Sequence, residues 1–554
     1  MKYANLSVMH RASCRRLGSR TALRYKQHGL FHDISWSTYR RRADMAAAGL
    51  IQLGVGPGDR VALFSENRHE WFVADHAMLS AGAITVPLHA PLTAEQAQYQ
   101  ISHSEARGVI VSNQAQADKV LSMLDSLPEL EFIVSFDSID TPKSLPSMAW
   151  EGLKHRGMLT GREGVAEIWR REAERSADDL ATIIYTSGTT GNPKGVMLTH
   201  GNLLSNAEGM LAVSEVFPSD TLLSWLPYSH IYARTVDHYV TTVAGLTVAL
   251  AESIDSLIVD LKMTTPNWMT AVPRFYEKVW MSVEQLAPAE RKAQLHAIFG
   301  PRVRYLSSGG APLPDHVCEG FIEAGIPLLE GYGLTETSPV VSFNSVDDIR
   351  VGTVGRTIPD VDVKIADDGE ILTRGPNIMQ GYWKNPEATA EVMADGWFAT
   401  GDVGELDADG YLKITDRKKD LIVTSGGKNI APSEIERLLV SDEYIDQAVV
   451  YGDGRQFISA LVVPNFPNLE EELGELGIAL EQDGPFLSDE KLHAFFDERI
   501  STVSQSVSQP ERVKKFLLLS APFKMEDDEL TATLKVRRRN IVDKYELQLA
   551  ALYD

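Results

Sequence analysis

Short apolar segments alternate with helix-like patterns through the first four hundred residues, and this alternation limits the fold more than any other feature. Residues 58–67 (GDRVALFSEN), 106–113 (ARGVIVSN) and 303–312 (VRYLSSGGAP) have the apolar centre and polar exit of buried strands. Residues 71–88 show a helical pattern, then Gly82, then a strand pattern. Such alternation is typical of α/β layers, in which ligands bind beyond the carboxyl ends of the strands.

The chain is too long for a single core, and its pattern changes along its length. It has 554 residues, and from about Val351 short strands with Gly and Asp turns replace the alternation, as in 363–375 and 404–417. After residues 416–420 (DRKKD) the pattern is that of a compact α+β unit. We therefore predict a large N-terminal domain of layered α/β sheets plus a small β region at 1–415. A smaller, mobile α+β domain is predicted at 416–554.

Charge and cysteine content exclude several classes of protein. A net charge of −23 argues against nonspecific nucleic-acid binding, although local N–H groups and lysines can still hold small anions. Two cysteines, Cys14 and Cys318, cannot build a disulfide framework. The start of the sequence lacks the apolar segment of a signal peptide, and no stretch is apolar enough to span a bilayer. We expect a cytoplasmic protein. The sequence leaves open whether the protein contacts a membrane peripherally and whether it is a monomer or a homodimer.

Residues Tyr185–Gly195 (YTSGTTGNPKG) form the most polar and flexible strand exit in the chain. Glycines let the backbone approach a ligand closely, and hydroxyls and Lys194 add donors and a positive charge, which suits phosphate oxygens. The pattern differs from the nucleotide P-loop, because Pro193 precedes the lysine and Gly195 follows it. Taken alone, such a segment is more typical of a Ser- and Gly-rich surface turn.

Further motifs follow this loop in a fixed order: 307–312 (SSGGAP), 330–337 (EGYGLTET), 397–402 (WFATGD), 416–432 (DRKKDLIVTSGGKNIAP) and 530–539 (LTATLKVRRR). Together they strongly resemble the adenylate-forming superfamily of acyl-CoA synthetases, adenylation domains and luciferases, over nearly the whole chain. The resemblance implies a carboxylate that attacks the α-phosphate of ATP and a thiol that then displaces AMP.

The resemblance also implies roles for individual residues. Glu336 would ligate Mg²⁺, Thr335 would bond the α-phosphate, and Tyr332 would offer a ring to adenine. Asp402 would accept the ribose hydroxyls, and Arg417 would reach the ribose or phosphate. The implied ATP and AMP site comprises Thr186, Ser187, Gly188, Thr189, Thr190, Gly191, Lys194, Gly309, Gly310, Ala311, Gly331, Tyr332, Gly333, Thr335, Asp402 and Arg417.

Three further assignments concern the C-terminal part of the chain. Lys535 matches the family's mobile lysine, which bridges the carboxylate and the α-phosphate during adenylation. Lys419 aligns with the residue about which the small domain rotates. Gly426, Gly427 and Lys428 match a loop that faces the pantetheine tunnel of coenzyme A. The alternative is that Lys419 and Lys535 are solvated surface charges without a functional role.

The choice of acid rests on residues 226–235 (LPYSHIYART), which are similar to the acyl-pocket stretch of long-chain fatty acid–CoA ligases, with His230 near the carboxylate. Trp225 and 338–343 (SPVVSF) are candidates for the pocket wall. The predicted function is an ATP- and Mg²⁺-dependent ligase that joins a medium- or long-chain fatty acid to coenzyme A. Alternatives are a fatty acyl-AMP ligase that loads a carrier protein's phosphopantetheine, a ligase of aryl or other acids, and a binding protein without catalysis.

Overall fold

The structure is a computed structural model that describes residues 2–143, 145–186, 192–425, 429–476, 480, 482–524, 527–530 and 536–553. The chain forms two compact units. The first comprises Met1–Val363, Thr373–Ala399 and Asp409–Tyr411, and the second comprises Lys364–Leu372, Thr400–Ala408 and Leu412–Asp554. The domain boundary expected at residue 416 stays a prediction.

An eight-stranded sheet in the first unit confirms the α/β pattern. Its order is β19-β9-β8-β4-β3-β5-β6-β7, and β3 to β8 run parallel while β9 and β19 are antiparallel to their neighbours. The strands are β3 (Arg60–Phe64), β4 (Ile84–Leu88), β5 (Ala106–Val111), β6 (Phe132–Ser135), β7 (Ser147–Ala149), β8 (Leu180–Thr186), β9 (Lys194–Thr199) and β19 (Gly381–Tyr382).

A nine-stranded sheet forms the other half of this unit. Its order is β16-β15-β14-β13-β12-β10-β11-β1-β2, parallel from β14 to β1 and antiparallel at both edges. The strands are β1 (Thr21–Gln27), β2 (Leu30–Ser35), β10 (Thr221–Ser224), β11 (Thr247–Leu250), β12 (Trp268–Ala271), β13 (Tyr305–Ser308), β14 (Leu328–Gly333), β15 (Val340–Phe343) and β16 (Arg356–Thr357).

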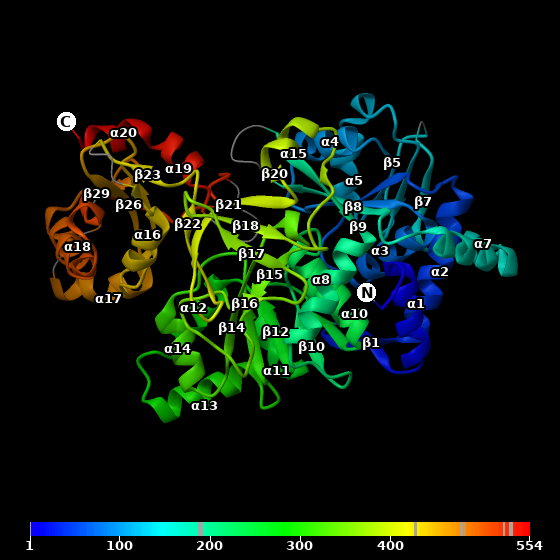
Figure 1. Cartoon of the computed structure of the whole chain (residues 1–554), viewed down its shortest axis with the longest axis horizontal. Helices are drawn as coiled ribbons and strands as arrows, with labels where there is room; N and C mark the ends of the chain where they lie inside the picture. Colours follow the sequence, from blue (N-terminus) through cyan, green and yellow to red (C-terminus); the bar gives the residue numbers. More distant parts are fainter. Residues whose placement is uncertain are drawn as a thin grey trace. The chain divides into compact units, whose positions relative to one another are not determined.

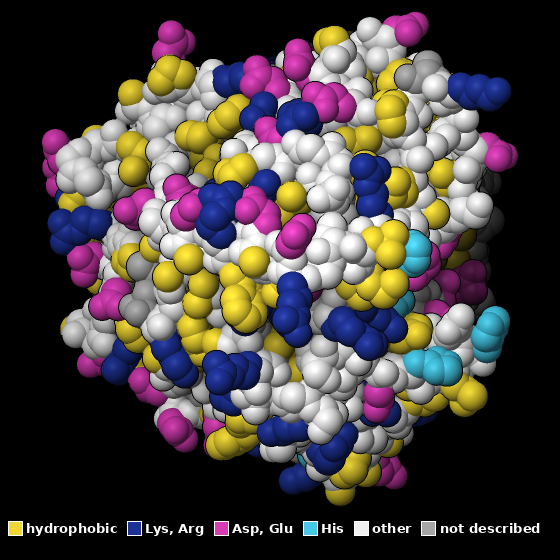
Figure 2. All heavy atoms as spheres, turned by 90° about the vertical axis from the view of Figure 1, so that its right-hand side faces the viewer, with side chains coloured by type: hydrophobic (Ala, Val, Ile, Leu, Met, Phe, Trp, Pro, Cys, Tyr) yellow, Lys and Arg dark blue, Asp and Glu magenta, His cyan; other side chains and the backbone are white. Residues whose placement is uncertain are grey.

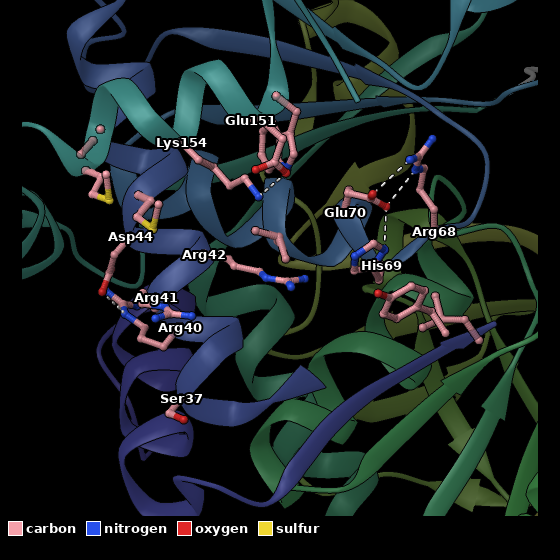
Figure 3. Close-up of a pocket in the computed structure, with 18 of the residues that line it drawn as sticks. Ser37, Arg40, Arg41, Arg42, Asp44, Arg68, His69, Glu70, Glu151 and Lys154 are labelled. Atoms are coloured by element: carbon pink, nitrogen blue, oxygen red, sulfur yellow. Dashed lines mark hydrogen bonds and ion pairs between the residues drawn. The ribbon is translucent and has the colours of Figure 1, made fainter. Parts of the chain in front are cut away.

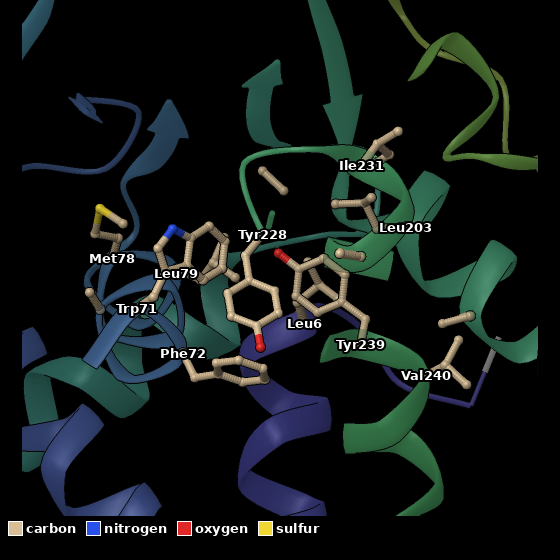
Figure 4. Packing of buried hydrophobic residues seen from close by; sticks show 14 of the residues in the cluster. Leu6, Trp71, Phe72, Met78, Leu79, Leu203, Tyr228, Ile231, Tyr239 and Val240 are labelled. Carbon is tan, nitrogen blue, oxygen red and sulfur yellow. The ribbon is translucent and has the colours of Figure 1, made fainter. Parts of the chain in front are cut away.

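Helices fill the space between the two sheets and cover their outer faces (Figure 1). One apolar core joins both sheets to the helices between them, where Phe72 of α3 packs edge-on against Tyr228 with ring centroids 4.7 Å apart (Figure 4). The inner helices are α1 (Leu6–Leu17), α2 (Trp36–Gln52), α3 (His69–Ala81), α8 (His200–Val213) and α10 (Thr241–Ala244). The outer ones include α4 (Ala94–His103), α5 (Gln114–Leu121), α11 (Leu257–Thr264), α12 (Pro273–Met281), α13 (Pro288–Phe299) and α14 (Asp315–Glu323).

Local sequence explains where these elements begin and end. Helix α8 follows β9 without a loop because Thr199 and Asn202 form a capping box at its first turn. Helix α3 ends at Gly82, whose φ of 88° lies in the left-handed region that glycine adopts without strain. Helix α6 (Trp150–Met158) and helix α7 (Gly161–Glu174) follow β7 and lie beside α2 and α3.

The small β region expected after residue 351 is present. It is a five-stranded sheet of β17 (Asp362–Ile365), β18 (Glu370–Arg374), β20 (Met393–Ala394), β21 (Trp397–Leu406) and β22 (Leu412–Arg417). Helix α15 (Pro386–Val392) precedes β20.

The second unit also contains a five-stranded sheet, in the order β25-β26-β29-β28-β27. The sequence of residues 446–464 predicts a hairpin about Gly452–Gly454, and it is confirmed, since β25 (Ile445–Tyr451) pairs antiparallel with β26 (Ile458–Pro464). The other strands are β27 (Gln482–Asp483), β28 (Phe486–Leu487) and β29 (Val513–Leu519). Apolar clusters pack it against α16 (Pro432–Val440), α17 (Phe466–Leu476) and α18 (Glu490–Val503), and against α19 (Arg538–Lys544) and α20 (Glu546–Ala551). Among the described residues no helix is both long and apolar enough to cross a bilayer.

Candidate active site

Both ends of the predicted phosphate loop are fixed in the eight-stranded sheet. Strands β8 and β9 form its hairpin, and Thr186 is the Cα partner of Lys194 at the open end. A hydrogen bond of 2.9 Å joins the Tyr185 hydroxyl to Nδ1 of His103, and the Tyr99 hydroxyl donates to the carbonyl oxygen of Pro193 over 3.2 Å. The predicted phosphate ligands Ser187, Gly188, Thr189, Thr190 and Gly191 lie outside the described residues.

Tyr382 connects the loop to the predicted metal ligand. The Lys194 ammonium lies 4.8 Å from the centroid of the Tyr382 ring, and the Tyr382 hydroxyl donates to Oε1 of Glu336 over 2.9 Å. Burial, and then the negative charge of Glu336, raise the pKa of Tyr382 well above its ordinary value. Tyr382 therefore stays a neutral donor that orients the Glu336 carboxylate.

The turn that carries Thr335 and Glu336 is held by buried side chains from distant segments. The Asn206 amide donates to the Val340 carbonyl over 2.7 Å, and the Asn377 amide donates to the Thr337 carbonyl over 2.9 Å. The turn also requires glycine before it, since a Cβ on Gly333 would lie 1.8 Å from the carbonyl oxygen of Pro339. The geometry at Thr335, which is buried, and Glu336, which is half-buried, is thus set by the whole unit.

The residues predicted beside adenine lie at the ends of β13 and β14. Gly331, Tyr332 and Gly333 form the last three positions of β14, and Gly309, Gly310 and Ala311 follow β13. A Cβ on Gly309 would lie 3.2 Å from the Tyr232 ring, so any larger residue at this position requires that ring to shift by a few tenths of an ångström. The backbone N–H of Tyr232 in turn donates to Nδ1 of His230 over 3.2 Å. Tyr232 thus lies between the predicted nucleotide residues and the predicted acyl residue His230.

A buried ion pair links this region to β8. Arg234 and Asp75 are fully buried, and a guanidinium N–H of Arg234 donates to Oδ1 of Asp75 over 2.5 Å. Arg234 also donates to the hydroxyl of Thr182 on β8 over 2.7 Å, and the Tyr239 hydroxyl donates to Oδ2 of Asp75 over 2.8 Å. Arg234 begins η2 (Arg234–Val240), a π-helix, so the pair joins that helix to the strand that enters the phosphate loop.

The predicted ribose ligands belong to the second unit. Asp402 on β21 and Arg417 on β22 are direct cross-strand partners, and Nε of Arg417 lies 3.3 Å from Oδ1 of Asp402. Asp402 is 4% exposed. Gly401 has a φ of 73°, and its N–H donates to the Glu370 carboxylate over 2.9 Å.

The remaining predicted residues belong to the acyl pocket, the hinge and the coenzyme A path. Lys419 follows β22, and its role as a hinge stays a prediction. Lys535 and the loop residues Gly426, Gly427 and Lys428 lie outside the described residues. Trp225 donates its indole N–H to the Thr270 carbonyl over 3.0 Å, and all four residues of β15 are buried. Their part in an acyl pocket also stays a prediction.

Sequence reasoning missed Tyr382, Tyr232, and the Arg234–Asp75 pair. Tyr382 reaches the loop because β19 pairs with β9, with Gly381 opposite Met197. A two-residue strand so far along the chain has no periodicity to reveal it. The available signal was the pair of adjacent aromatic residues Tyr382 and Trp383.

Comparison with known proteins agrees with this architecture. Residues 10–383 match the model of the AMP-binding enzyme family, and residues 419–554 match that of the AMP-binding enzyme C-terminal domain. The chain therefore belongs to the AMP-binding enzyme family.

The chain is also similar to named members of this group. It is 34% identical to long-chain-fatty-acid–CoA ligase FadD15 of Mycobacterium bovis, over 95% of this chain and 93% of that one. It is 30% identical to peroxisomal long chain acyl-CoA synthetase 7 of Arabidopsis thaliana, over 93% and 81%. Among solved structures, the adenylation domain of a carboxylate reductase from Mycobacterium chelonae superposes with a TM-score of 0.83 at 23% identity, over 100% and 92% of the two chains.

Proposed function

We propose that this protein is an AMP-forming ligase that activates a medium- or long-chain fatty acid as acyl-AMP and transfers the acyl group to coenzyme A. The observation that carries the proposal is the Lys194–Tyr382–Glu336 arrangement at the open end of the β8–β9 hairpin. The relatives named long-chain-fatty-acid–CoA ligase and acyl-CoA synthetase, which match along nearly the full chain, support the choice of acid and acceptor.

In the first half-reaction a carboxylate oxygen attacks the α-phosphorus of ATP and pyrophosphate leaves. Both reactants are anions, so the site must position them and neutralise charge. Lys194 would contribute positive charge at the base of the phosphate loop. Thr335 would donate to the α-phosphate, and His230 would lie near the incoming carboxylate. Lys535 would bridge the two anions during attack.

Glu336 fits a magnesium site. A half-buried carboxylate, oriented by one phenol, is a hard oxygen ligand of the kind that Mg²⁺ takes together with substrate phosphates. When bound, the ion would neutralise charge on the phosphates. Within the described residues no cluster of three His, Cys, Asp or Glu side chains could replace it as an all-protein site.

In the second half-reaction the thiol sulfur of coenzyme A attacks the acyl carbon and AMP leaves as the carbon–oxygen bond breaks. Asp402 and Arg417 would retain AMP through its ribose until then. Residues 426–428 would line the path of the pantetheine arm, and rotation about Lys419 would remove Lys535 from the α-phosphate. The domain division at 415/416 is part of this proposal.

Two assays on the full chain test the proposal. Purified protein with ATP, Mg²⁺ and saturated acids from C2 to C18 should release pyrophosphate and, once coenzyme A is added, form thioester. Burial contributes roughly 0.8 kcal/mol per CH₂, so kcat/KM should rise by several-fold per methylene until the acyl slot is full. An optimum at acetate or benzoate would overturn the fatty-acid assignment, and activity with only a pantetheinylated carrier protein would overturn coenzyme A as acceptor.

A further inference from the structure

A large cavity lies in the first unit, apart from every residue assigned to the nucleotide. Its volume is about 1100 Å³, and α2, α3, α6, the α6–α7 turn and the ends of β1 and β11 line it (Figure 3). Sites for drug-sized ligands occupy roughly 300–1,000 Å³, so the cavity can hold more than a simple ion. Nothing in the proposed chemistry uses it.

The charges that line the cavity leave an excess of two arginines. Each carboxylate on the wall already has a cation as partner: Asp44 has Arg40, Glu70 has Arg68, Glu151 has Lys154, and Glu252 has Lys26. Arg41 and Arg42 also line the wall, and within the described part of the chain neither side chain has an ion pair or hydrogen bond. Arg42 is half-buried, and Figure 3 shows it extending across the cavity from α2 toward His69. In a chain of net charge −23, this wall is therefore a local concentration of positive charge.

The rim beside these arginines is apolar and open to solvent. Met158 and Val165 line the cavity and are 52% and 38% exposed, and Leu159 beside them is 71% exposed. Trp169, one helical turn after Val165 on α7, is 57% exposed. Apolar and basic side chains lie side by side on the face of the molecule shown in Figure 2. Large apolar side chains grouped at a cavity mouth indicate an apolar ligand group.

We propose that this cavity binds an anionic amphiphile, with its charged head group at Arg41 and Arg42 and its alkyl chain over Met158 and Val165. The ligand can be a free alkyl anion or a phospholipid in a bilayer, since both present the same chemistry. The segment next to the cavity also supports this class of ligand, and this argument rests on the proposed function. Asn67 lines the cavity, and its amide donates to the carbonyls of Trp225 and Leu226 over 3.0 and 2.7 Å. The cavity therefore adjoins residues 225–235, the segment that is predicted to bind the fatty acid.

Binding can be measured at the cavity itself, without ATP or coenzyme A. Cys14 and Cys318 are both buried, so a Met158→Cys variant can be labelled selectively at the rim with an environment-sensitive fluorophore. The probes are dodecyl phosphate below its micellar concentration, inorganic phosphate, and phosphatidylcholine vesicles with or without phosphatidylglycerol. Dodecyl phosphate should give a saturable response. Inorganic phosphate at the same concentrations should give none.

Charge variants in the labelled background decide the outcome. Arg41→Gln with Arg42→Gln should weaken binding at least tenfold, while Arg42→Lys should retain most of it. Arg15→Gln with Lys262→Gln, which removes two exposed cations outside the cavity wall, should bind like the parent.

A response to phosphatidylglycerol vesicles alone would identify a bilayer lipid as the source, and a response to the monomer would identify a free amphiphile. Equal binding by the parent and the double arginine variant, or an equal response to inorganic phosphate, would overturn the proposal. Because the label reports on the cavity, a failure here is distinct from a failure of ligase activity.

Discussion

The hydroxyl of Tyr382 donates to the carboxylate of Glu336 over 2.9 Å, although 45 residues separate them along the chain. The same tyrosine presents its ring to the Lys194 ammonium at 4.8 Å. One side chain thus sets the distance between the phosphate loop and the carboxylate expected to hold the metal.

Removing that hydroxyl should slow adenylation without unfolding the protein. We expect Tyr382→Phe to reduce the rate of pyrophosphate release by about tenfold, because Glu336 loses one hydrogen bond that orients it. Glu336→Gln should cost on the order of 10²-fold or more, as when a metal clamp on phosphate weakens. The Mg²⁺ concentration for half-maximal rate should also rise in Tyr382→Phe. A parental Mg²⁺ dependence in that variant would contradict the role given to Tyr382.

The Asp402–Arg417 pair should govern affinity for ATP. Asp402→Asn should raise the KM for ATP more than it lowers kcat, because charge-assisted hydrogen bonds to ribose are lost. Arg417→Lys keeps the charge but not the planar fork, so we expect an intermediate effect. Steady-state kinetics with ATP and with 2′-deoxy-ATP test whether Asp402 contacts the ribose. The ratio of kcat/KM for the two nucleotides should be closer to one in Asp402→Asn than in the parent. Unchanged discrimination would place the ribose elsewhere.

The buried Arg234–Asp75 pair should be a major source of stability. Replacing Arg234 by Met leaves Asp75 fully buried without its cation, and such a loss costs about 3–5 kcal/mol. Asp75→Leu alone strands the arginine in the same way. The double variant should lose less than the sum of the two single losses, which chemical denaturation of all four proteins measures. Additive losses would mean that the two charges do not stabilise each other.

Asp237 should make stability depend on pH. It is fully buried, and burial raises the pKa of this carboxyl to about 7 from an ordinary 3.8, although the hydroxyls of Ser224 and Thr270 donate to it. Between pH 4 and 7 the folded state then binds a proton that the unfolded state has released, so the free energy of unfolding falls as pH rises through this window. The full loss is on the order of 4 kcal/mol above pH 7. Asp237→Asn should remove this slope, seen by comparing denaturation midpoints at pH 5 and 8. A variant with the parent's pH dependence would refute the assignment.

The two lysines assigned to alternation should fail in opposite half-reactions. Proline fixes φ near −65°, so Lys419→Pro should hold one arrangement of the C-terminal part. If that arrangement is the adenylating one, acyl-AMP still forms while thioester output collapses. Lys535→Ala should block acyl-AMP formation from ATP yet convert supplied acyl-AMP with coenzyme A. Equal loss of both half-reactions in both variants would indicate misfolding instead.

Much of the fold could be predicted from sequence because its periodicity is strong. The helix–Gly82–strand pattern, the 445–464 hairpin and the small β region all carry local signals, and each is present. The family motif at 330–337 identified Thr335 and Glu336 as candidates, and in the structure they follow β14. What these motifs left out was the set of residues that hold them, such as Asn206 and Asn377, because a buried amide that binds a distant carbonyl leaves no pattern along the chain.

The cavity beside α2 escaped prediction for a related reason. In sequence, Arg40, Arg41 and Arg42 read as one basic run, which is usually a solvated helix face. In the fold they differ, since Arg40 is neutralised by Asp44 and Glu172 whereas the other two are not. Asp44, one helical turn after Arg40, and Glu172, 132 residues further along the chain, distinguish Arg40 from its two neighbours.

The pairing of β19 with β9 also has a consequence for biosynthesis. Gly381 and Tyr382 close the edge of the sheet beside a hairpin made about 185 residues earlier. The ribosome adds roughly 5–20 residues per second, and domains fold while synthesis continues. The β8–β9 hairpin is therefore synthesised about ten seconds or more before its edge partner β19. During that interval β9 presents an unpaired strand edge, which is a template for association with other chains. The nascent protein should accordingly depend on chaperones until synthesis passes residue 382.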